Sequence, residues 1–274
     1  MERKIRVAVL GAAGRMGRQL VDCVLNEPGM TLAAALERED CPLLGQDAGT
    51  VAGVGGCGVA LAADVPAALG QCDVVIDFTA AEVTRRIAPQ AAAAGVAMVI
   101  GSTGLTDADM QSLEQLAAAG ARIVQAPNMS VGVNLLFALS RRVARTLGED
   151  YDVEIVEMHH NQKKDAPSGT AERLGQIVCE ERGLDYRHDA RHGREGLVGA
   201  RTKHEIGMHS LRGGDVVGDH TVIFAAEGER LELTHKASSR RTFAAGAVRA
   251  AKFVFAAQPG RYDMQDVLGL KEPQ

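Results

Sequence analysis

Short apolar runs alternate with helix-like segments through the first half of the chain. The run over residues 5–10 ends at a glycine, as a buried strand does. Met16, Leu20 and Val24 then recur at a four-residue step, which predicts a helix. The same alternation predicts strands over 30–36, 74–78, 96–100 and 121–125, and helices over 82–94 and 106–119. Because strands covered by helices on both faces are apolar throughout, we expect a Rossmann-type, doubly wound parallel sheet of the α/β class over about residues 1–128.

The pattern changes after residue 128. A long helix over 131–147 is followed by a strand over 153–158, a polar loop and a second helix over 171–181. Strands punctuated by glycines follow residue 200, and the pair over 221–226 and 231–235 reads as a hairpin. These elements predict a second domain of mixed α+β structure. A helix is also expected over 243–256, but its pattern does not say which domain it joins.

Composition narrows the class of protein. The 274 residues are 46% hydrophobic and 24% charged, and the net charge of -5 leaves no excess of basic residues for binding nucleic acid. No apolar run approaches the roughly 20 residues of a membrane span. Residues 1–4 lead straight into the first strand, so we expect no signal peptide. Five cysteines without a C-x-x-C pair favour a reducing compartment, so we expect a cytoplasmic protein.

A glycine-rich turn follows the first predicted strand and opens the first helix. Glycine permits the tight turn and a close approach of backbone to a pyrophosphate, while the helix N-terminus supplies free N–H groups. A tight turn that binds nothing is the alternative, but the place of the motif in the first strand–helix–strand unit favours a dinucleotide. The residues expected to bind it are Gly11, Ala12, Ala13, Gly14, Arg15, Met16 and Gly17.

Further cofactor contacts are expected where other strands end. Glu37 and Arg38 close the second strand, where an acid binds the ribose of NAD and an arginine binds the 2′-phosphate of NADP. The pair therefore predicts that NADH and NADPH are both accepted, although a solvated charge pair would look the same. Two turns at the ends of later strands are candidates as well, with plain turn chemistry as the alternative; they contribute Gly101, Ser102, Thr103, Ala126, Pro127, Asn128 and Met129.

Residues 157–170 gather many polar groups between a predicted strand and a predicted helix. His159 and His160 are suited to exchanging a proton near neutral pH, and Lys163 can bind a carboxylate or stabilise negative charge. The paired histidines could ligate zinc, but no H-E-x-x-H motif or cysteine cluster accompanies them, so we expect no metal. A charged surface loop is the other alternative, and the density of these groups beside a dinucleotide fold argues against it.

The helix after this loop predicts an anion site. Ser168 can cap that helix, so that the N–H groups of Gly169 and Thr170 point to open space, where a carboxylate or a phosphate would bind.

The chain closely resembles the dihydrodipicolinate reductases, which are also called 4-hydroxy-tetrahydrodipicolinate reductases. The likeness covers nearly the whole chain, and the run Asp-Ala-Pro-Ser-Gly-Thr beside two histidines is its most specific part. It is carried by the motifs at residues 9–17, 76–79, 101–104, 128–134, 159–163, 165–170 and 235–240.

This resemblance implies a reaction and an assembly. In the family, NADH or NADPH reduces a small cyclic dicarboxylate, and the product is tetrahydrodipicolinate of the diaminopimelate route to lysine. It implies a homotetramer whose cofactor domain comprises residues 1–128 and 241–274. Residues 129–240 would form the substrate-binding and oligomerisation domain.

The resemblance also assigns roles to residues of the polar loop. His159 and Lys163 are implied to be catalytic, as proton donors or acceptors. His160, Thr103, Gly169 and Thr170 are implied to bind the substrate's carboxylates. Two positions, Met129 and Lys164, depart from the family. Met129 stands where the family usually has phenylalanine, and the more flexible methionine would fill the space at the nicotinamide end less rigidly. Lys164 adds a cation that is either solvated or attracts the dianion.

Two other classes of protein would share parts of this pattern. An amino-acid dehydrogenase that acts on an oxo-acid would keep the glycine turn but has no need for residues 165–170 beside paired histidines. A redox-sensing dinucleotide-binding protein would keep residues 11–17 and lose the proton donors, which this chain retains.

Overall fold

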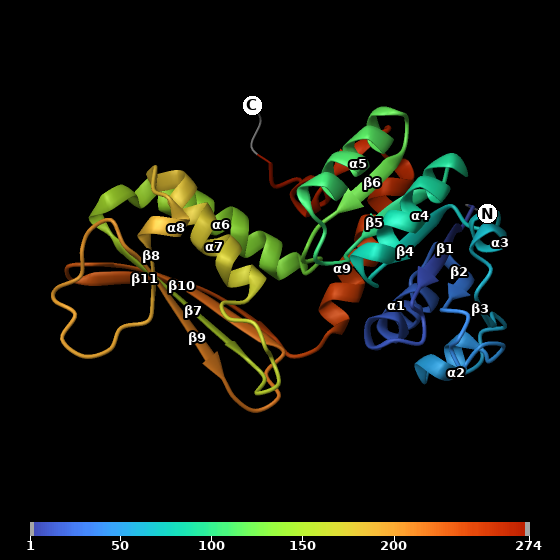
Figure 1. Cartoon of the computed structure of the whole chain (residues 1–274), viewed down its shortest axis with the longest axis horizontal. Helices are drawn as coiled ribbons and strands as arrows, with labels where there is room; N and C mark the ends of the chain where they lie inside the picture. Colours follow the sequence, from blue (N-terminus) through green and yellow to red (C-terminus); the bar gives the residue numbers. More distant parts are fainter. Residues whose placement is uncertain (1–2, 272–274) are drawn as a thin grey trace. The chain divides into compact units, whose positions relative to one another are not determined.

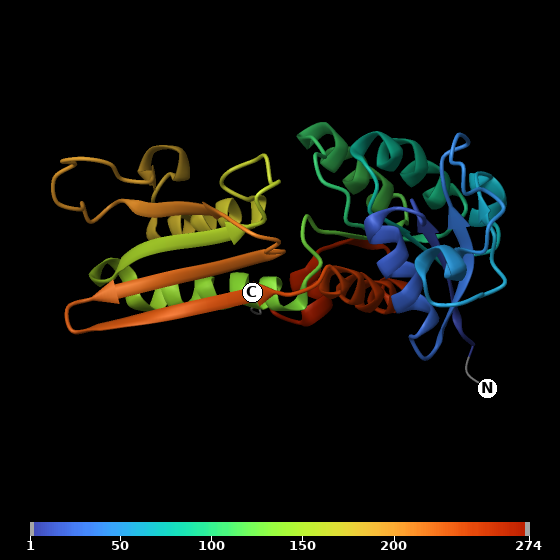
Figure 2. The ribbon, with the colours of Figure 1, turned by 90° about the horizontal axis from the view of Figure 1, so that it is seen from below.

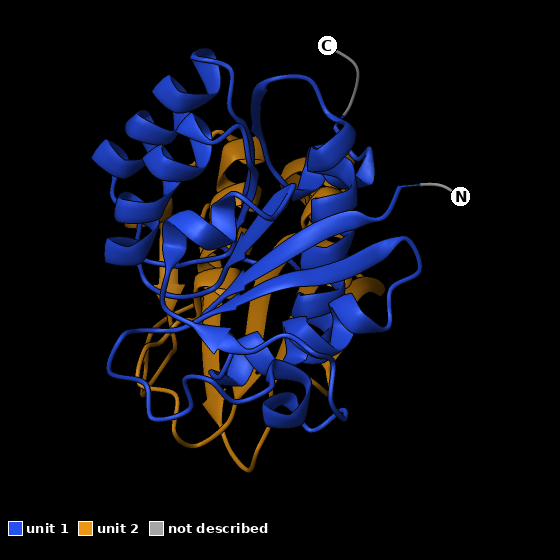
Figure 3. Ribbon diagram, turned by 90° about the vertical axis from the view of Figure 1, so that its right-hand side faces the viewer, with its two compact units in different colours: residues 1–131, 240–274 blue, residues 132–239 orange. Residues whose placement is uncertain are grey.

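The structure is a computed structural model that describes residues 3–271, shown from two sides in Figures 1 and 2. The chain divides into two compact units, which Figure 3 distinguishes by colour. The first unit comprises residues 1–131 and 240–274, and the second comprises residues 132–239. No helix in the described part of the chain is long and apolar enough to cross a membrane.

A seven-stranded parallel sheet forms the centre of the first unit, in the order β12-β6-β5-β4-β1-β2-β3. The order reverses between β1 and β4, and ligands of such sheets bind in the crevice at the strand ends there. The predicted doubly wound sheet is therefore confirmed. The strands are β1 (Ile5–Leu10), β2 (Met30–Leu36), β3 (Leu61–Ala62), β4 (Val74–Asp77), β5 (Ala97–Ile100), β6 (Arg122–Gln125) and β12 (Gly260–Tyr262).

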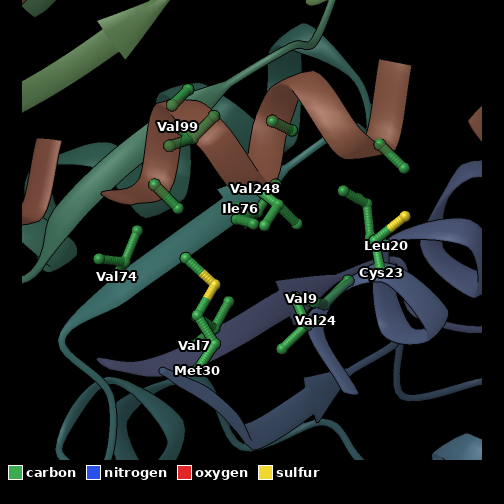
Figure 4. Close-up of a cluster of buried hydrophobic side chains, with 14 of the residues drawn as sticks. Val7, Val9, Leu20, Cys23, Val24, Met30, Val74, Ile76, Val99 and Val248 are labelled. Atoms are coloured by element: carbon green, nitrogen blue, oxygen red, sulfur yellow. The ribbon is translucent and has the colours of Figure 1, made fainter. Parts of the chain in front are cut away.

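Helices cover both faces of this sheet, because successive side chains of each strand point to opposite sides. Val7 and Val9 of β1 pack with α1 and α9, as Figure 4 shows, whereas Ala8 and Leu10 pack against α3 and α4. The helices are α1 (Arg15–Leu25), α2 (Ala48–Ala52), α3 (Val65–Leu69), α4 (Ala81–Ala93), α5 (Asp107–Ala118), α9 (Arg241–Ala256) and α10 (Met264–Leu268).

The boundary between the units lies after Val131 rather than after residue 128. Met129 is buried in the core of the first unit. Gly246 of α9 approaches it so closely that a β-carbon at Gly246 would lie 1.8 Å from the carbonyl oxygen of Met129. The helix predicted over 243–256 thus belongs to the first unit, and its Gly246 allows the helix to pack closely against the chain at Met129.

The second unit is built on a mixed five-stranded sheet in the order β11-β10-β7-β9-β8. The β7–β9 and β8–β9 pairs are parallel, and the other two are antiparallel. The predicted hairpin is confirmed as β10 and β11. The strands are β7 (Asp152–His159), β8 (Ala190–His192), β9 (Ile206–Arg212), β10 (Gly218–Ala226) and β11 (Glu229–Ala237).

Two helices, α6 and α7, pack on one face of this sheet, which we call the covered face (Figure 1). Val153 and Ile155 of β7 lie on it with Val222 and Phe224 of β10, all fully buried. Alternate residues of each strand therefore belong to one core. The helical elements of this unit are α6 (Val131–Leu147), η1 (Gly148–Asp150), α7 (Gly169–Arg182) and α8 (Tyr186–Asp189).

We predict that Gly246→Ala destabilises the first unit. The added β-carbon would collide with the Met129 backbone, and overpacking of this kind costs about 1–3 kcal/mol of unfolding free energy. Urea unfolding measures the effect. Gly56→Ala is the control, because nothing lies within 4 Å of a β-carbon there; its stability should change by less than about 1 kcal/mol. Equal stability of Gly246→Ala and the wild type would contradict the packing described here.

Candidate active site

The glycine-rich turn joins β1 to α1 at the crevice of the first sheet. Gly11 has a φ of 64°, which favours glycine, and the Gly14 N–H donates to its carbonyl oxygen. A β-carbon at Gly17 would lie 2.0 Å from that same oxygen, so only glycine lets α1 pack on the turn. No side chain caps α1 at Gly14, which leaves the first N–H groups of the helix available to an anion.

A cavity of about 260 Å³ opens beside this turn, within the first unit. Its floor is apolar, with Leu10 and Leu36 from the ends of β1 and β2. Its polar rim is formed by Glu37, Arg38, Thr79 and Arg86. An apolar slot with a charged rim at the switch point of a doubly wound sheet fits the adenosine half of a dinucleotide.

The charges on that rim differ in how they are paired. The Glu37 carboxylate accepts a hydrogen bond of 2.9 Å from the Ala13 N–H, which ties the end of β2 to the glycine turn. Arg38 forms an ion pair with Asp40 at 3.2 Å, in which both side chains are mostly exposed. Arg86 of α4 is exposed and has no ionic partner among the described residues. The rim therefore offers one acceptor and two guanidinium groups.

The turns after β5 and β6 lie at the same edge of the sheet. The Ser102 hydroxyl is buried and has no hydrogen-bond partner in the described part of the chain, which fits a ligand at this edge. Thr103 beside it is exposed. The Asn128 side chain accepts from the Ser130 N–H at 2.9 Å and shapes the second turn. The Met129 side chain is buried in the core of the first unit.

The polar groups of the second unit collect at one end of its covered face. The alternation that buries Val153 and Ile155 continues along β7, so Glu157 and His159 lie on the same face. Strand register places Arg212 of β9 opposite His159, and His220 of β10 opposite Glu157. Together with Ser168, the cap of α7, these residues form what we call the histidine cluster: Glu157, His159, Ser168, Arg212 and His220.

Glu157 is the centre of this cluster and is 1% exposed. Its Oε2 lies 2.5 Å from Nδ1 of His159 and accepts from Nη1 of Arg212 at 3.0 Å. Its Oε1 accepts from Nη2 of Arg212 at 2.9 Å and from the Ser168 N–H at 3.2 Å. Both carboxylate oxygens are thus fully engaged.

The two histidines of the cluster are shifted toward their neutral forms. Burial lowers the pKa of His159, the hydrogen bond to Glu157 opposes that effect, and the charges of Lys163 and Arg212 add to it, with a net lowering. Burial lowers the pKa of His220 to about 3. The His220 ring stands edge-on to His159 with centroids 5.2 Å apart, and its Nε2 is 3.0 Å from the Ser168 hydroxyl.

The loop after β7 holds the other sequence-predicted residues of this unit. Both Asp165 oxygens lie 2.8 Å from Nζ of Lys163, whose side chain is 19% exposed. His160 donates its backbone N–H to Val216 and accepts from the Gln162 N–H at its Nδ1. Lys164 is exposed and forms no ion pair within the described residues.

The N-terminus of α7 lies beside the cluster. The predicted cap is confirmed, because the Ser168 hydroxyl accepts from the Ala171 N–H at 3.2 Å. Gly169 is exposed, and its N–H has no acceptor in the described part of the chain; Thr170 is half-buried. Among residues 3–271, no group of three or more His, Cys, Asp or Glu side chains is placed to hold a metal ion.

Sequence reasoning missed three members of the cluster. Glu157 could have been found from the sequence, because it occupies an inward position of a strand that alternates apolar and polar residues. A buried carboxylate there needs hydrogen-bond donors around it. Arg212 and His220 lie on other strands, and nothing local in the sequence marks them as partners of residue 157.

The first unit, with a glycine turn at the switch point of a doubly wound sheet, and the second, with an acid–base cluster, define a pyridine-nucleotide-dependent oxidoreductase. Residues 5–129 match the family model for the N-terminus of dihydrodipicolinate reductase, and residues 132–268 match the model for its C-terminus. The chain belongs to the dihydrodipicolinate reductase family.

Individual relatives agree with this assignment. The 4-hydroxy-tetrahydrodipicolinate reductases of Pelobacter propionicus and Geobacter metallireducens are each 52% identical over 267 residues, which is 97% of this chain and 100% of theirs. A dipicolinate-bound dihydrodipicolinate reductase from Paenisporosarcina sp. TG-14 has a TM-score of 0.76 at 28% identity, covering 96% of this chain and 98% of that one. An amine dehydrogenase from Mycobacterium smegmatis, at 16% identity and a TM-score of 0.60, shares the fold.

We predict that His220 makes stability depend on pH. Its pKa is about 3 in the folded chain and 6.5 in the reference state, so the unfolded chain binds the proton more readily. The contribution of neutral His220 is therefore complete above pH 6.5 and is lost as pH falls toward 3. His220→Gln should flatten the fall in unfolding free energy across this window, as urea titrations at each pH would show. The exposed His204→Gln should keep the wild-type slope; an unchanged slope in His220→Gln would contradict the assignment.

Proposed function

We propose that this chain catalyses the NADH- or NADPH-dependent reduction of 4-hydroxy-tetrahydrodipicolinate to tetrahydrodipicolinate, with loss of water, in the diaminopimelate route to lysine. The proposal rests on the family and on one observation, the hydrogen bond between the buried Glu157 carboxylate and His159. That contact makes His159 an oriented acid–base group rather than a surface imidazole.

The residues of the second unit can bind a dianion. Lys163 brings a cation, and the Gly169 N–H, which has no acceptor among the described residues, lies at the positive end of α7. His160 and Thr170 flank these groups in the same loop and helix turn. Asp165 pairs with the Lys163 ammonium group, and we infer that a substrate carboxylate replaces Asp165 there.

The reaction consumes one proton for each hydride, because the 4-hydroxyl leaves as water. His159 is proposed to supply that proton from its ring. Its lowered pKa makes it a readier donor than an ordinary histidine and leaves it mostly neutral at neutral pH. Lys163 beside it would stabilise negative charge that develops on the substrate.

The first unit is proposed to hold the cofactor. Residues 11–17 would bind the pyrophosphate, Glu37 the ribose, and the turns at 101–103 and 126–129 the nicotinamide end, with Met129 contributing backbone only. Thr103 is also proposed to contact a substrate carboxylate. When bound, the reduced nicotinamide supplies the hydride.

Both cofactors are proposed to be accepted. Glu37 is an acceptor for ribose hydroxyls, and the same cavity rim carries Arg38 and Arg86 as donors to a 2′-phosphate. Arg86 lacks an ionic partner among residues 3–271, so binding a phosphate would break no ion pair described there.

We propose a homotetramer that assembles through the second unit. Its two long helices pack on the covered face only, and the opposite face carries Val156, Met158, Leu211 and Ile223, none of them buried. Leu211 is 49% exposed. Copies of this chain would cover these exposed apolar side chains in a tetramer. Light scattering should give four times the chain mass of 28.9 kDa; a monomer at micromolar concentration would contradict this.

A cytoplasmic location is also proposed. All five cysteines are free, and burial raises the pKa of both Cys72 and Cys179 to about 11, which keeps these thiols protonated and unreactive.

The reaction is tested by a coupled assay. Aspartate semialdehyde, pyruvate and the synthase that precedes this step supply the substrate, and oxidation of NADH and NADPH is followed by absorbance. We expect both cofactors to be oxidised only when all components are present. Oxidation of neither would contradict the proposed function.

We predict that His159→Gln lowers kcat by roughly 100- to 10,000-fold with little change in substrate KM, since it removes a proton donor but not a carboxylate contact. Steady-state kinetics measure this, with His204→Gln as the control. Wild-type turnover in His159→Gln would remove His159 from the mechanism.

Lys163→Ala should lower kcat/KM by roughly 100-fold, through both binding and turnover, because a charge-assisted contact is lost. Lys164→Ala is the matched control, since its exposed ammonium has no partner in the described residues. Similar kinetics for the two variants would refute a specific role for Lys163.

Arg38→Ala should raise KM for NADPH by about tenfold and leave that for NADH nearly unchanged, because only NADPH carries the 2′-phosphate. Removing Arg86 as well should widen the difference. Equal losses for the two cofactors would place the 2′-phosphate elsewhere.

A further inference from the structure

We propose that Glu157 is a positioning residue that fixes the tautomer of His159, so that Nε2 is the atom that exchanges the proton. The proposal rests on the proposed function only in taking His159 as the acid–base group. All the contacts that support it lie within the second unit.

The Glu157 carboxylate cannot turn away from His159. Arg212 donates to both carboxylate oxygens, at 2.9 and 3.0 Å. The N–H of Ser168, the N-cap of α7, also donates to Oε1. Oε2 is therefore held 2.5 Å from Nδ1 of His159. A bidentate guanidinium and a helix cap together define one orientation of the carboxylate.

The ionisation of Glu157 decides which imidazole nitrogen carries the proton. Burial acts to raise the pKa of Glu157, but the hydrogen bonds that Arg212, His159 and Ser210 donate outweigh it and hold the pKa below its usual value. An ionised carboxylate only accepts hydrogen bonds, so Nδ1 must be the donor. Neutral His159 is then protonated on Nδ1, and its Nε2 lone pair is free to take or return a proton.

The surroundings of Nε2 are consistent with that assignment. It has no hydrogen-bond partner in the described part of the chain. A β-carbon at Gly218 would lie 3.0 Å from it, so glycine leaves the space beside it open. His220 supports the ring edge-on, and its own Nε2 is bound to Ser168, so it does not compete for the proton.

The charges around His159 come from every neighbouring element. Lys163 in the loop and Arg212 on β9 oppose its protonation, Glu157 on β7 favours it, and His220 on β10 is neutral near pH 7. Glu157 is thus the one negative charge among these four, and removing it should make His159 harder to protonate.

The same strand supplies a matched control on its other face. Glu154 accepts from Arg194 and Arg201 and lies 2.6 Å from Nε2 of His209. This carboxylate–histidine pair repeats the chemistry of Glu157 and His159 away from the histidine cluster. Glu154→Gln therefore removes a comparable network without touching the proposed active site.

The first experiment is nitrogen-15 NMR of the full chain labelled at histidine, without ligands, at neutral pH. The wild type should show His159 protonated on Nδ1, with Nε2 unprotonated. His159→Gln assigns the signal. Protonation of Nε2 in the neutral wild type would overturn the proposal, and this measurement needs no folded Glu157 variant and no activity.

The second experiment follows the Glu157→Gln variant. We expect a mixed tautomer, a lower pKa of His159 in the NMR titration, and kcat lower by roughly 10- to 100-fold with substrate KM little changed. The limb of the pH–rate profile that reports protonated His159 should move to lower pH. Glu157→Asp, which keeps the charge, should restore the limb in part, and Glu154→Gln should leave both the limb and kcat at wild-type values.

The outcomes separate this proposal from the proposed function. If Glu157→Gln has the wild-type pH profile and kcat while His159→Gln is inactive, Glu157 does not position His159, and the reaction assignment stands. If Glu157→Gln and Glu154→Gln lose stability alike and neither moves the pH profile, Glu157 is only structural. If His159→Gln has wild-type turnover, the role of His159 itself fails.

Discussion

A carboxylate that is almost fully buried must be matched by donors, and the second unit is arranged around the one at Glu157. Arg212 reaches it from β9, the Ser168 N–H from the start of α7, and His159 from two residues along β7. Three separate elements therefore converge on one anion. That convergence places an imidazole, a helix N-terminus and a lysine loop at the same end of the covered face.

The first unit obeys a different constraint, the order of its parallel strands. All strand ends of a parallel sheet that point the same way lie at one edge, so the loops after β1, β2, β5 and β6 meet there. Glycine is required at two points of the first loop, by the positive φ of Gly11 and by the contact at Gly17. The Glu37 carboxylate then ties the second loop to the first. A dinucleotide would bind in the crevice at these strand ends.

Much of this fold could be predicted from the sequence, since apolar runs and four-residue steps are local signals. The glycine-rich stretch over 40–63 contains α2 and β3, which the sequence did not predict, because a five-residue helix and a two-residue strand are too short to leave a periodic pattern. The burial of Met129 could not be read from the sequence, because it involves packing against α9, more than a hundred residues away. Only part of the histidine cluster could be predicted from the sequence. The loop after β7 has a dense polar motif, but Arg212 and His220 join the cluster only through strand register.

The central claim is that the histidine cluster faces the bound substrate, and a crystal structure of this chain with a nicotinamide cofactor and dipicolinate tests it most directly. We expect Nε2 of His159 within about 3.5 Å of the ligand, and one ligand carboxylate on the Gly169 N–H and the Lys163 ammonium. A ligand bound away from this cluster, with His159 still enclosed by protein atoms, would contradict the account.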